Sequence, residues 1–136
     1  MADTLRLEIV TPAGTAFAAD VHMVTLPAVD GQIGVYPHHV RLLTQLVPGE
    51  IIVNTQDSES SLAVGEGMVE VTDRRVSIVT DMAIPAEHID EAMVEEARAR
   101  AAARLQEKIS DEEVASVNAS LARSLAQLQV RRRRRT

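Results

Sequence analysis

The sequence predicts an N-terminal antiparallel β-sandwich, or flattened barrel, over residues 1–84, followed by an antiparallel hairpin of two helices with an arginine-rich tail over residues 85–136. Up to about residue 80, short runs rich in β-branched residues are separated by turn-forming residues, with no helical pattern between them. After residue 81 alanine and glutamate become frequent, and neither Gly nor Pro occurs beyond Pro85. This change of composition predicts a boundary between two domains.

The first strand is predicted from strict alternation. Leu5, Leu7 and Ile9 alternate with the polar Arg6 and Glu8, which is the pattern of a strand with one buried face. Turns are expected at residues 11–14, 30–31, 48–49, 56–59 and 73–74. The other strand candidates are residues 21–26, a run that contains Gly34 and ends at Pro37, and residues 50–55, 61–64, 68–72 and 75–80.

Two apolar groups within the sandwich invite a closer interpretation. Val69 and Val71 share one face of their strand, while Met68, Glu70 and Thr72 share the other. A second group follows Pro37 and suits one short helical turn or a buried loop. Its members are Val40, Leu42, Leu43 and Leu46.

Capping signals predict the two helices. Asp90 is the expected N-cap of a helix over residues 91–107, in which acidic residues come early and basic residues late, as the helix dipole favours. Ser110 and Glu113 form a Ser-x-x-Glu capping box, so a second helix should start there and run to about Gln129. Its apolar stripe is predicted to be Val114, Val117, Leu121, Leu125 and Leu128, opposed by Ile89, Met93, Ala97, Ala101 and Leu105 of the first helix.

The predicted hairpin has little apolar area with which to hold its place. Each fully buried Leu or Val stabilises by about 1.5–3 kcal/mol, whereas ordering the backbone costs roughly 1–2 kcal/mol per residue. We therefore expect a hairpin whose stability depends on docking and which can dock in more than one place, as a conformational switch requires.

Composition excludes several classes of function. The chain has no cysteine, which removes disulfides and thiol chemistry, and its two aromatic residues give no platform for stacking bases, so no nucleic-acid partner is expected. The N-terminus lacks the pattern of a signal peptide and no apolar run is long enough to span a bilayer, which favours a soluble, cytoplasmic protein. The formal net charge is −6 although residues 131–135 are all arginine, so an acidic body carries a basic tip. That tip indicates either a contact with a negative partner or a frayed, solubilising tail.

No constellation of catalytic or metal-binding residues stands out. The histidines His22, His38, His39 and His88 do not have ligand spacing, and adjacent residues of an extended segment point to opposite sides. No nucleophile elbow and no phosphate-binding glycine loop occurs. We expect a protein that is not itself an enzyme and has no cofactor and no metal.

The segment from residue 30 to residue 50 resembles the signature of the epsilon subunit of bacterial F-type ATP synthase. A Gly-x-x-Gly-x-x-Pro frame leads through a histidine to paired leucines and Pro-Gly. The residues that carry this resemblance are Gly31, Gly34, Pro37, His39, Leu42, Leu43, Pro48 and Gly49. The chain departs from the pattern at His38 and at Val40-Arg41, where the family has a small residue and Ala-Pro. The likeness continues through residues 64–67, 69–71, 76–80 and 89–92, so it spans nearly the whole chain.

The resemblance implies a subunit of the rotating central stalk. The sandwich would join the gamma subunit to the c-ring for proton-driven ATP synthesis, peripheral to the cell inner (plasma) membrane on its cytoplasmic side. Residues Asp30, Gly31 and Gln32, at a turn, and His39 would be candidates for contact with the c-ring. The alternative is a non-rotary adaptor that binds an acidic partner, nucleic acid or an anionic membrane through its arginine-rich tail.

The resemblance also implies a regulatory role for the hairpin. An extended form would reach the catalytic beta and alpha subunits and block ATP hydrolysis, with Arg123, Arg131, Arg132, Arg133, Arg134 and Arg135 as candidate inhibitory contacts. Some members bind ATP through an Ile/Leu-Asp-x-x-Arg-Ala motif, and Ile89 and Asp90 match its first two positions. Met93 replaces the arginine and offers no charge to a phosphate, so we expect this motif to be degenerate.

Overall fold

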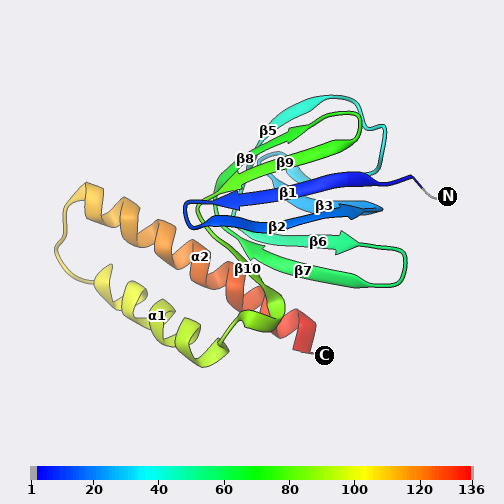
Figure 1. Cartoon of the computed structure of the whole chain (residues 1–136). Coiled ribbons are helices and arrows are strands. Elements are labelled where there is room, and N and C mark those ends of the chain that lie inside the picture. The colour runs from blue at the N-terminus through cyan, green and yellow to red at the C-terminus, as the bar shows by residue number, and fades with distance from the viewer. Residues whose placement is uncertain (1–2, 136) are drawn as a thin grey trace.

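The computed structural model describes residues 3–135, and of residue 135 only the backbone. Ten strands are followed by a two-helix hairpin that lies against one side of the strands (Figure 1). The strands are β1 (Leu5–Thr11), β2 (Gly14–Val21), β3 (Met23–Ala28), β4 (Gly31–Val35), β5 (Leu42–Leu46), β6 (Gly49–Asn54), β7 (Glu59–Val64), β8 (Gly67–Val71), β9 (Arg75–Thr80) and β10 (Ala83–Pro85). A 3-10 turn, η1 (Ala86–His88), leads into the helices α1 (Glu91–Arg104) and α2 (Asp111–Arg135).

The strands form one continuous sheet that folds back on itself. Their order is β10-β7-β6-β3-β5-β8-β9-β1-β2, with β4 also paired to β3. The fold-over lies at β3, which pairs with β6 near its start and meets β5 at its end, where Ala28 lies opposite Leu46. Every pair is antiparallel except β1 with β9, which run parallel. The predicted antiparallel sandwich is therefore confirmed, with one parallel pair that the sequence pattern did not show.

The main core belongs to the sandwich alone. Its 17 buried residues are all Leu, Ile, Val or Ala, and they lie between Leu5 and Ile78. The alternation in β1 places Leu5, Leu7 and Ile9 in this core with at most 1% of their surface exposed. Val69 and Val71, which share one face of β8, are likewise buried. Burying this much aliphatic surface is the main stabilising contribution to the sandwich.

One strand prediction was wrong in its bounds, and one strand was not predicted. The run predicted at residues 21–26 is divided, because Val21 ends β2 and β3 begins only at Met23. β2 escaped prediction since it lies at the end of the strand order, pairs only with β1, and has an alanine-rich sequence with few buried residues. β3 also continues through Pro27, whose carbonyl oxygen accepts a hydrogen bond from the Val47 amide at 3.0 Å.

The apolar group after Pro37 forms a strand rather than a helical turn or buried loop. Leu42–Leu46 is β5, which pairs residue by residue with β8 from Leu42 opposite Val71 to Leu46 opposite Gly67. Only Leu46 is buried in the core, whereas Leu43 is 68% exposed. Cross-strand hydrogen bonding over five residues outweighs the helix-like spacing of the leucines.

Both capping predictions are confirmed. The Asp90 carboxylate accepts a hydrogen bond from the Met93 amide at 3.2 Å, and the Ser110 hydroxyl accepts one from the Glu113 amide at 3.2 Å. The helix ends differ from the prediction in opposite directions. α1 stops at Arg104 instead of residue 107, while α2 continues past Gln129 through the arginine run.

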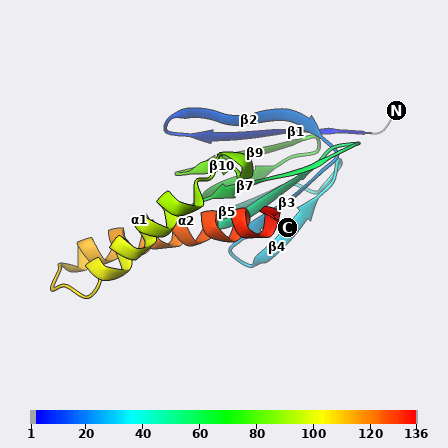
Figure 2. The same cartoon turned by 90° about the horizontal axis from the view of Figure 1, so that it is seen from below.

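The hairpin docks through the C-terminal half of α2. This half packs beside β6, β7 and η1, and α1 packs on α2 (Figures 1 and 2). Val130 is fully buried in a small cluster with Ala63, Ala86 and Ile89, separate from the main core. No residue of α1 is buried. The hairpin is thus attached to the sandwich at one end only.

The predicted apolar stripe of α2 is only partly correct. Leu128 is buried, but Leu125 is 49% exposed. The buried residues of α2 form two pairs instead, Ser124 with Leu128 and Ala126 with Val130. The members of each pair are four residues apart and therefore share one face of the helix. Two faces are covered because this half of the helix lies between α1 and the sheet, a placement that helical periodicity alone does not reveal.

Candidate functional site

The β3–β4 turn is an exposed tip formed by the predicted residues. Val29 and Asp30 make the turn, and Gly31 follows with a φ of +124°, a conformation that favours glycine. Asp30, Gly31 and Gln32 are all exposed and adjacent. They present one carboxylate, one amide and an accessible backbone to any protein that reaches this end of the sandwich.

A shallow groove joins this turn to the hairpin. Gly31 and Gln32 line it together with Gly49 and Glu50 at the start of β6. Gln129 of α2 is also part of its lining. The turn at the tip of the sandwich therefore lies next to the docked end of the helix. No sequence pattern indicated this neighbourhood, since it joins residues about one hundred positions apart.

His39 lies away from that turn. It follows the far end of β4, and since a strand rises about 3.3 Å per residue, the length of β4 separates the two. Its Nδ1 donates a hydrogen bond to the Val40 carbonyl oxygen at 2.7 Å. The structure thus brings Asp30, Gly31 and Gln32 together but does not place His39 with them.

His38, which was not a candidate, holds two loops together. Its φ is +69°, its Nδ1 lies 3.2 Å from Asp73 Oδ1, and its Nε2 lies 3.0 Å from Asp3 Oδ2. The hydrogen bond to Asp3, followed by the hydrogen bond to and charge of Asp73, raises the pKa of His38. This histidine therefore ties the N-terminal segment to the β8–β9 turn most strongly when it is protonated.

The degenerate motif before α1 has structural duties. Ile89 is buried in the small cluster beneath α2, and Asp90 caps α1. Met93, at the position of the family's arginine, is 67% exposed and has an uncharged side chain. The arrangement secures the start of the hairpin, and the side chains at these three positions provide no cation for a nucleotide phosphate.

Consecutive arginines at the end of α2 are engaged by carboxylates. Arg133 makes a two-pronged contact with Glu50, with Nε–Oε1 and Nη2–Oε2 both at 2.7 Å. Arg134 Nη1 lies 3.1 Å from Glu59 Oε1, and Arg132 Nε lies 2.8 Å from Glu91 Oε1. The hydrogen bonds to Glu91 and Glu50 raise the pKa values of Arg132 and Arg133, respectively, above the ordinary value of arginine. The tail therefore continues α2, and of the two alternatives left open for it, contact with acidic groups rather than a frayed tail describes residues 132–134.

The other arginine candidates are distributed differently. Arg123 Nη1 lies 3.2 Å from Asp81 Oδ2, where α2 first meets the sandwich. Arg131 is half-buried. Arg135 belongs to α2, and its side chain lies outside the described residues.

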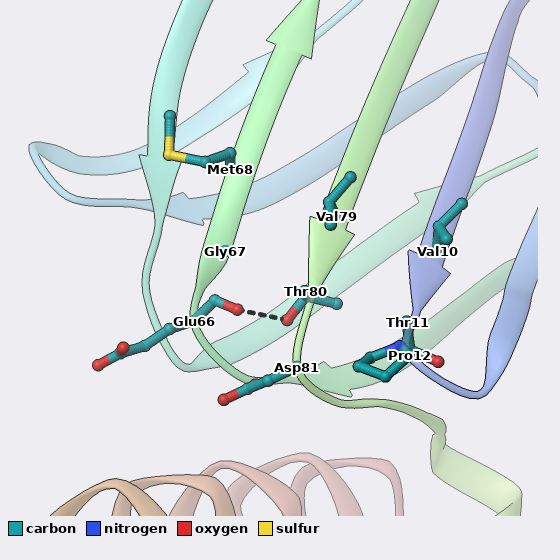
Figure 3. A pocket seen from close by; sticks show the side chains of 9 residues that line it. All are labelled: Val10, Thr11, Pro12, Glu66, Gly67, Met68, Val79, Thr80 and Asp81. Atoms are coloured by element: carbon teal, nitrogen blue, oxygen red, sulfur yellow. Dashed lines mark hydrogen bonds between the residues drawn. The ribbon is translucent and has the colours of Figure 1, made fainter.

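The outer face of the β8-β9-β1 sheet carries a surface that sequence analysis did not single out. Val79 lies opposite Met68 on one side and Val10 on the other, and the three are 61%, 47% and 37% exposed. Figure 3 shows them side by side above an apolar groove that ends at Pro12 and Asp81. We call Val10, Met68 and Val79 the apolar row. The outward position of Met68 in a strand with Val69 and Val71 buried was the signal available in the sequence.

The edge of this groove is closely built. An added Cβ at Gly67 would lie 1.9 Å from the Val79 carbonyl oxygen, so glycine is required for β8 and β9 to approach. The Thr80 hydroxyl donates a hydrogen bond to the Glu66 carbonyl oxygen at 2.8 Å, as drawn in Figure 3. A rigid rim around exposed aliphatic side chains is typical of a protein-binding surface.

The described residues offer neither a metal centre nor a helix suited to cross a membrane. Within residues 3–135, no group of three or more histidine and acidic side chains is arranged to hold a metal ion. Of the helices in the same range, none combines the length and apolar character that crossing a bilayer requires.

Comparison with protein families places both parts of the chain in one family. Residues 4–86 match the beta-sandwich domain of the ATP synthase delta/epsilon chain, and residues 87–131 match the long alpha-helix domain of the same chain. The chain is 39% identical over 129 residues to the ATP synthase epsilon chain of Hydrogenovibrio crunogenus, covering 95% of this chain and 90% of that one. It is 37% identical over 131 residues to the epsilon chain of Herpetosiphon aurantiacus, covering 96% of each.

Solved structures share the fold. A chain in the cryo-EM structure of Euglena gracilis mitochondrial ATP synthase, comprising OSCP, F1 and c-ring, aligns with a TM-score of 0.77 and 22% identity over 93% of this chain and 79% of that one. A chain in the central stalk and c-ring of the Tetrahymena thermophila mitochondrial ATP synthase aligns with a TM-score of 0.64 and 11% identity over 97% and 96%. At these identities the likeness shows a common architecture.

Proposed function

The chain belongs to the delta/epsilon chain family of ATP synthase, and we propose on this premise that it is the epsilon subunit of a bacterial F-type enzyme. It is a non-catalytic subunit of the central stalk that joins gamma to the c-ring. The observation that carries this function is that relatives called ATP synthase epsilon chain align over nearly the whole length of both chains. The adaptor alternative loses its main support, because Arg132, Arg133 and Arg134 are engaged within the chain.

The apolar row is our candidate for the gamma interface. Its three side chains are exposed although they are aliphatic, and they lie on a sheet face that the hairpin does not cover. Contiguous exposed apolar surface on a small protein is costly in water unless a partner covers it. Gamma is the partner that a stalk subunit must grip tightly enough to transmit torque.

The β3–β4 turn is our candidate for the c-ring contact. Asp30, Gly31 and Gln32 project at one end of the sandwich, as a subunit resting on a ring of neighbouring proteins requires. His39 lies beyond the other end of β4 and is the weaker candidate. We place the boundary between the stalk-binding sandwich and the hairpin at residues 84–85, within β10.

The hairpin is proposed to inhibit ATP hydrolysis when it leaves the sandwich. Its docking uses a small apolar cluster and ion pairs rather than the main core, which suits an element with two positions. Extended α2 would carry Arg123 and the arginine run toward the catalytic beta and alpha subunits. The protein would be peripheral to the inner (plasma) membrane, on the cytoplasmic side, through its complex.

Co-purification with gamma tests the stalk role. Val79→Asp places a charge in the centre of the apolar row and should weaken binding to gamma at least tenfold, since an unpaired charge is poorly accommodated in an apolar interface. Gln56→Asp, in the exposed β6–β7 loop, is the matched control and should bind normally. Normal gamma binding by Val79→Asp would exclude the apolar row. Failure of the wild-type chain to bind gamma would exclude the stalk role itself.

A further inference from the structure

The end of α2 is fastened to three different elements by three successive residues. Arg132 reaches α1 through Glu91 and Glu95, Arg133 reaches β6 through Glu50, and Arg134 reaches β7 through Glu59. Successive residues of a helix point about 100° apart, so three consecutive arginines can contact partners on three sides. The carboxylates of Glu50, Glu59, Glu91 and Glu95 all belong to elements other than α2.

The central contact is the most enclosed. The Glu50 side chain is only 10% exposed, and both its oxygens accept hydrogen bonds from Arg133, at 2.7–2.9 Å. A two-pronged arginine–carboxylate pair with restricted access to water is stronger and more directional than an open surface pair. The main chain takes part as well, because Arg134 Nη2 donates to the Glu59 carbonyl oxygen at 2.7 Å.

An apolar contact supports the ion pairs. Val130, two residues before Arg132, is fully buried against Ala63, Ala86 and Ile89. Withdrawal of α2 would therefore break the ion pairs and expose this cluster together. Nearer its N-terminus, α2 also meets the sandwich where Arg123 pairs with Asp81. Buried residues of α2 between Arg123 and Val130 continue this contact.

We propose that Arg133 and Arg134 with Glu50 and Glu59 form an ionic latch that holds the hairpin on the sandwich, while Arg132 ties α2 to α1, and that these contacts withhold the three arginines from any acidic partner. The proposal deepens the inhibitory role given above and rests on it for its regulatory meaning. Arg133 and Arg134 have two competing sets of partners. In the docked form they pair with Glu50 and Glu59 of the same chain, and in the extended form they pair with an acidic partner protein. Screening by salt or loss of the glutamates opens the latch and makes the arginines available.

Substituting the glutamates rather than the arginines distinguishes the docking role of the arginines from their inhibitory role. Replacing arginines removes both the docked contacts and any inhibitory contacts. Replacing Glu50 and Glu59 by Gln removes only the docked contacts and leaves the arginines intact. The control is Glu96→Gln, because Glu96 pairs at 3.0 Å with Arg100 inside α1 and has no part in the latch.

Hydrogen exchange in the isolated full chain tests the latch directly. We expect the Glu50→Gln/Glu59→Gln double variant to accelerate exchange of α2 amides 124–130 by about five- to tenfold at low salt, consistent with the loss of one enclosed and one open ion pair. Added salt should accelerate exchange in the wild type and have little further effect in the double variant. Exchange within twofold of Glu96→Gln at low salt would overturn the latch.

Reconstituted enzyme then tests its regulatory use. The double variant should lower ATP hydrolysis because a released hairpin with intact arginines extends more often. Arg132→Gln/Arg133→Gln/Arg134→Gln should release the hairpin equally in exchange yet fail to lower hydrolysis. Faster exchange supports the latch whatever the hydrolysis rate, whereas faster exchange with unchanged hydrolysis in the double variant would overturn the proposed inhibitory function alone.

Discussion

Val130→Ala should loosen the hairpin while leaving the sandwich stable. Val130 is fully buried in a cluster with Ala63, Ala86 and Ile89 that is separate from the main core. The substitution removes two methyl groups, at about 0.8 kcal/mol each, and the cavity left behind raises the total to about 2 kcal/mol. Since about 1.4 kcal/mol corresponds to a factor of ten, the undocked population should rise about 30-fold.

Native-state hydrogen exchange followed by NMR resolves the two parts. Amides of α2 in residues 124–130 should exchange about 30-fold faster, while amides of β9, within the main core, should keep their wild-type rates. Val40→Ala makes the same chemical change at a side chain that is 76% exposed and serves as the control. Equal acceleration in α2 and β9 would show that the hairpin and the sandwich unfold as one unit, which would refute the separation of the two clusters.

Three further predictions concern other parts of the chain. A chain ending at His88 should fold, with dispersed amide NMR signals, because it keeps the entire main core and β10; collapsed dispersion would show that the hairpin is integral. Magnesium-ATP should bind with a dissociation constant of about 1 mM or weaker in calorimetry, and Met93→Arg should tighten it; submillimolar affinity of the wild type would contradict this. NMR titration should give His38 a pKa above its ordinary value of 6.5, because its ring N–H groups donate hydrogen bonds to Asp3 and Asp73. Its stabilising contribution is therefore full below about pH 6.5 and is lost as pH rises through the raised pKa. Asp3→Asn should lower that midpoint, and an unchanged midpoint would exclude the contact.

Local signals predicted the fold where one interaction decides the outcome. Alternation placed Leu5, Leu7 and Ile9 in the core, and single hydrogen bonds at Asp90 and Ser110 set the starts of the helices. β5 was misjudged because its spacing suits a helix, and only pairing with a strand more than twenty residues later makes it extended. Propensity is a weak guide where a partner strand supplies the hydrogen bonds.

The candidate site was predictable to a smaller extent. The turn at Asp30 and Gly31 follows from glycine chemistry, and its exposure follows from being a turn. The partners of the arginine run could not be predicted, because Glu50 and Glu59 are brought to it by the folding of β6 and β7. Charge composition indicated a basic tip that seeks carboxylates, but only the tertiary structure shows that those carboxylates lie in the same chain.

Attachment at one end makes the docked hairpin a lever. Residues 111–123 of α2 include none that are buried, so at about 1.5 Å per residue roughly 20 Å of helix projects past the sandwich, as Figures 1 and 2 show. The latch lies roughly 15 Å to the other side of the contact between Arg123 and Asp81, which acts as the fulcrum. If α2 tilts as a rigid rod, a displacement of a little more than 1 Å at the loop between α1 and α2 therefore stretches the ion pairs by about 1 Å. A neighbouring protein that touches the loop between α1 and α2 could release the arginines mechanically, without ever approaching them.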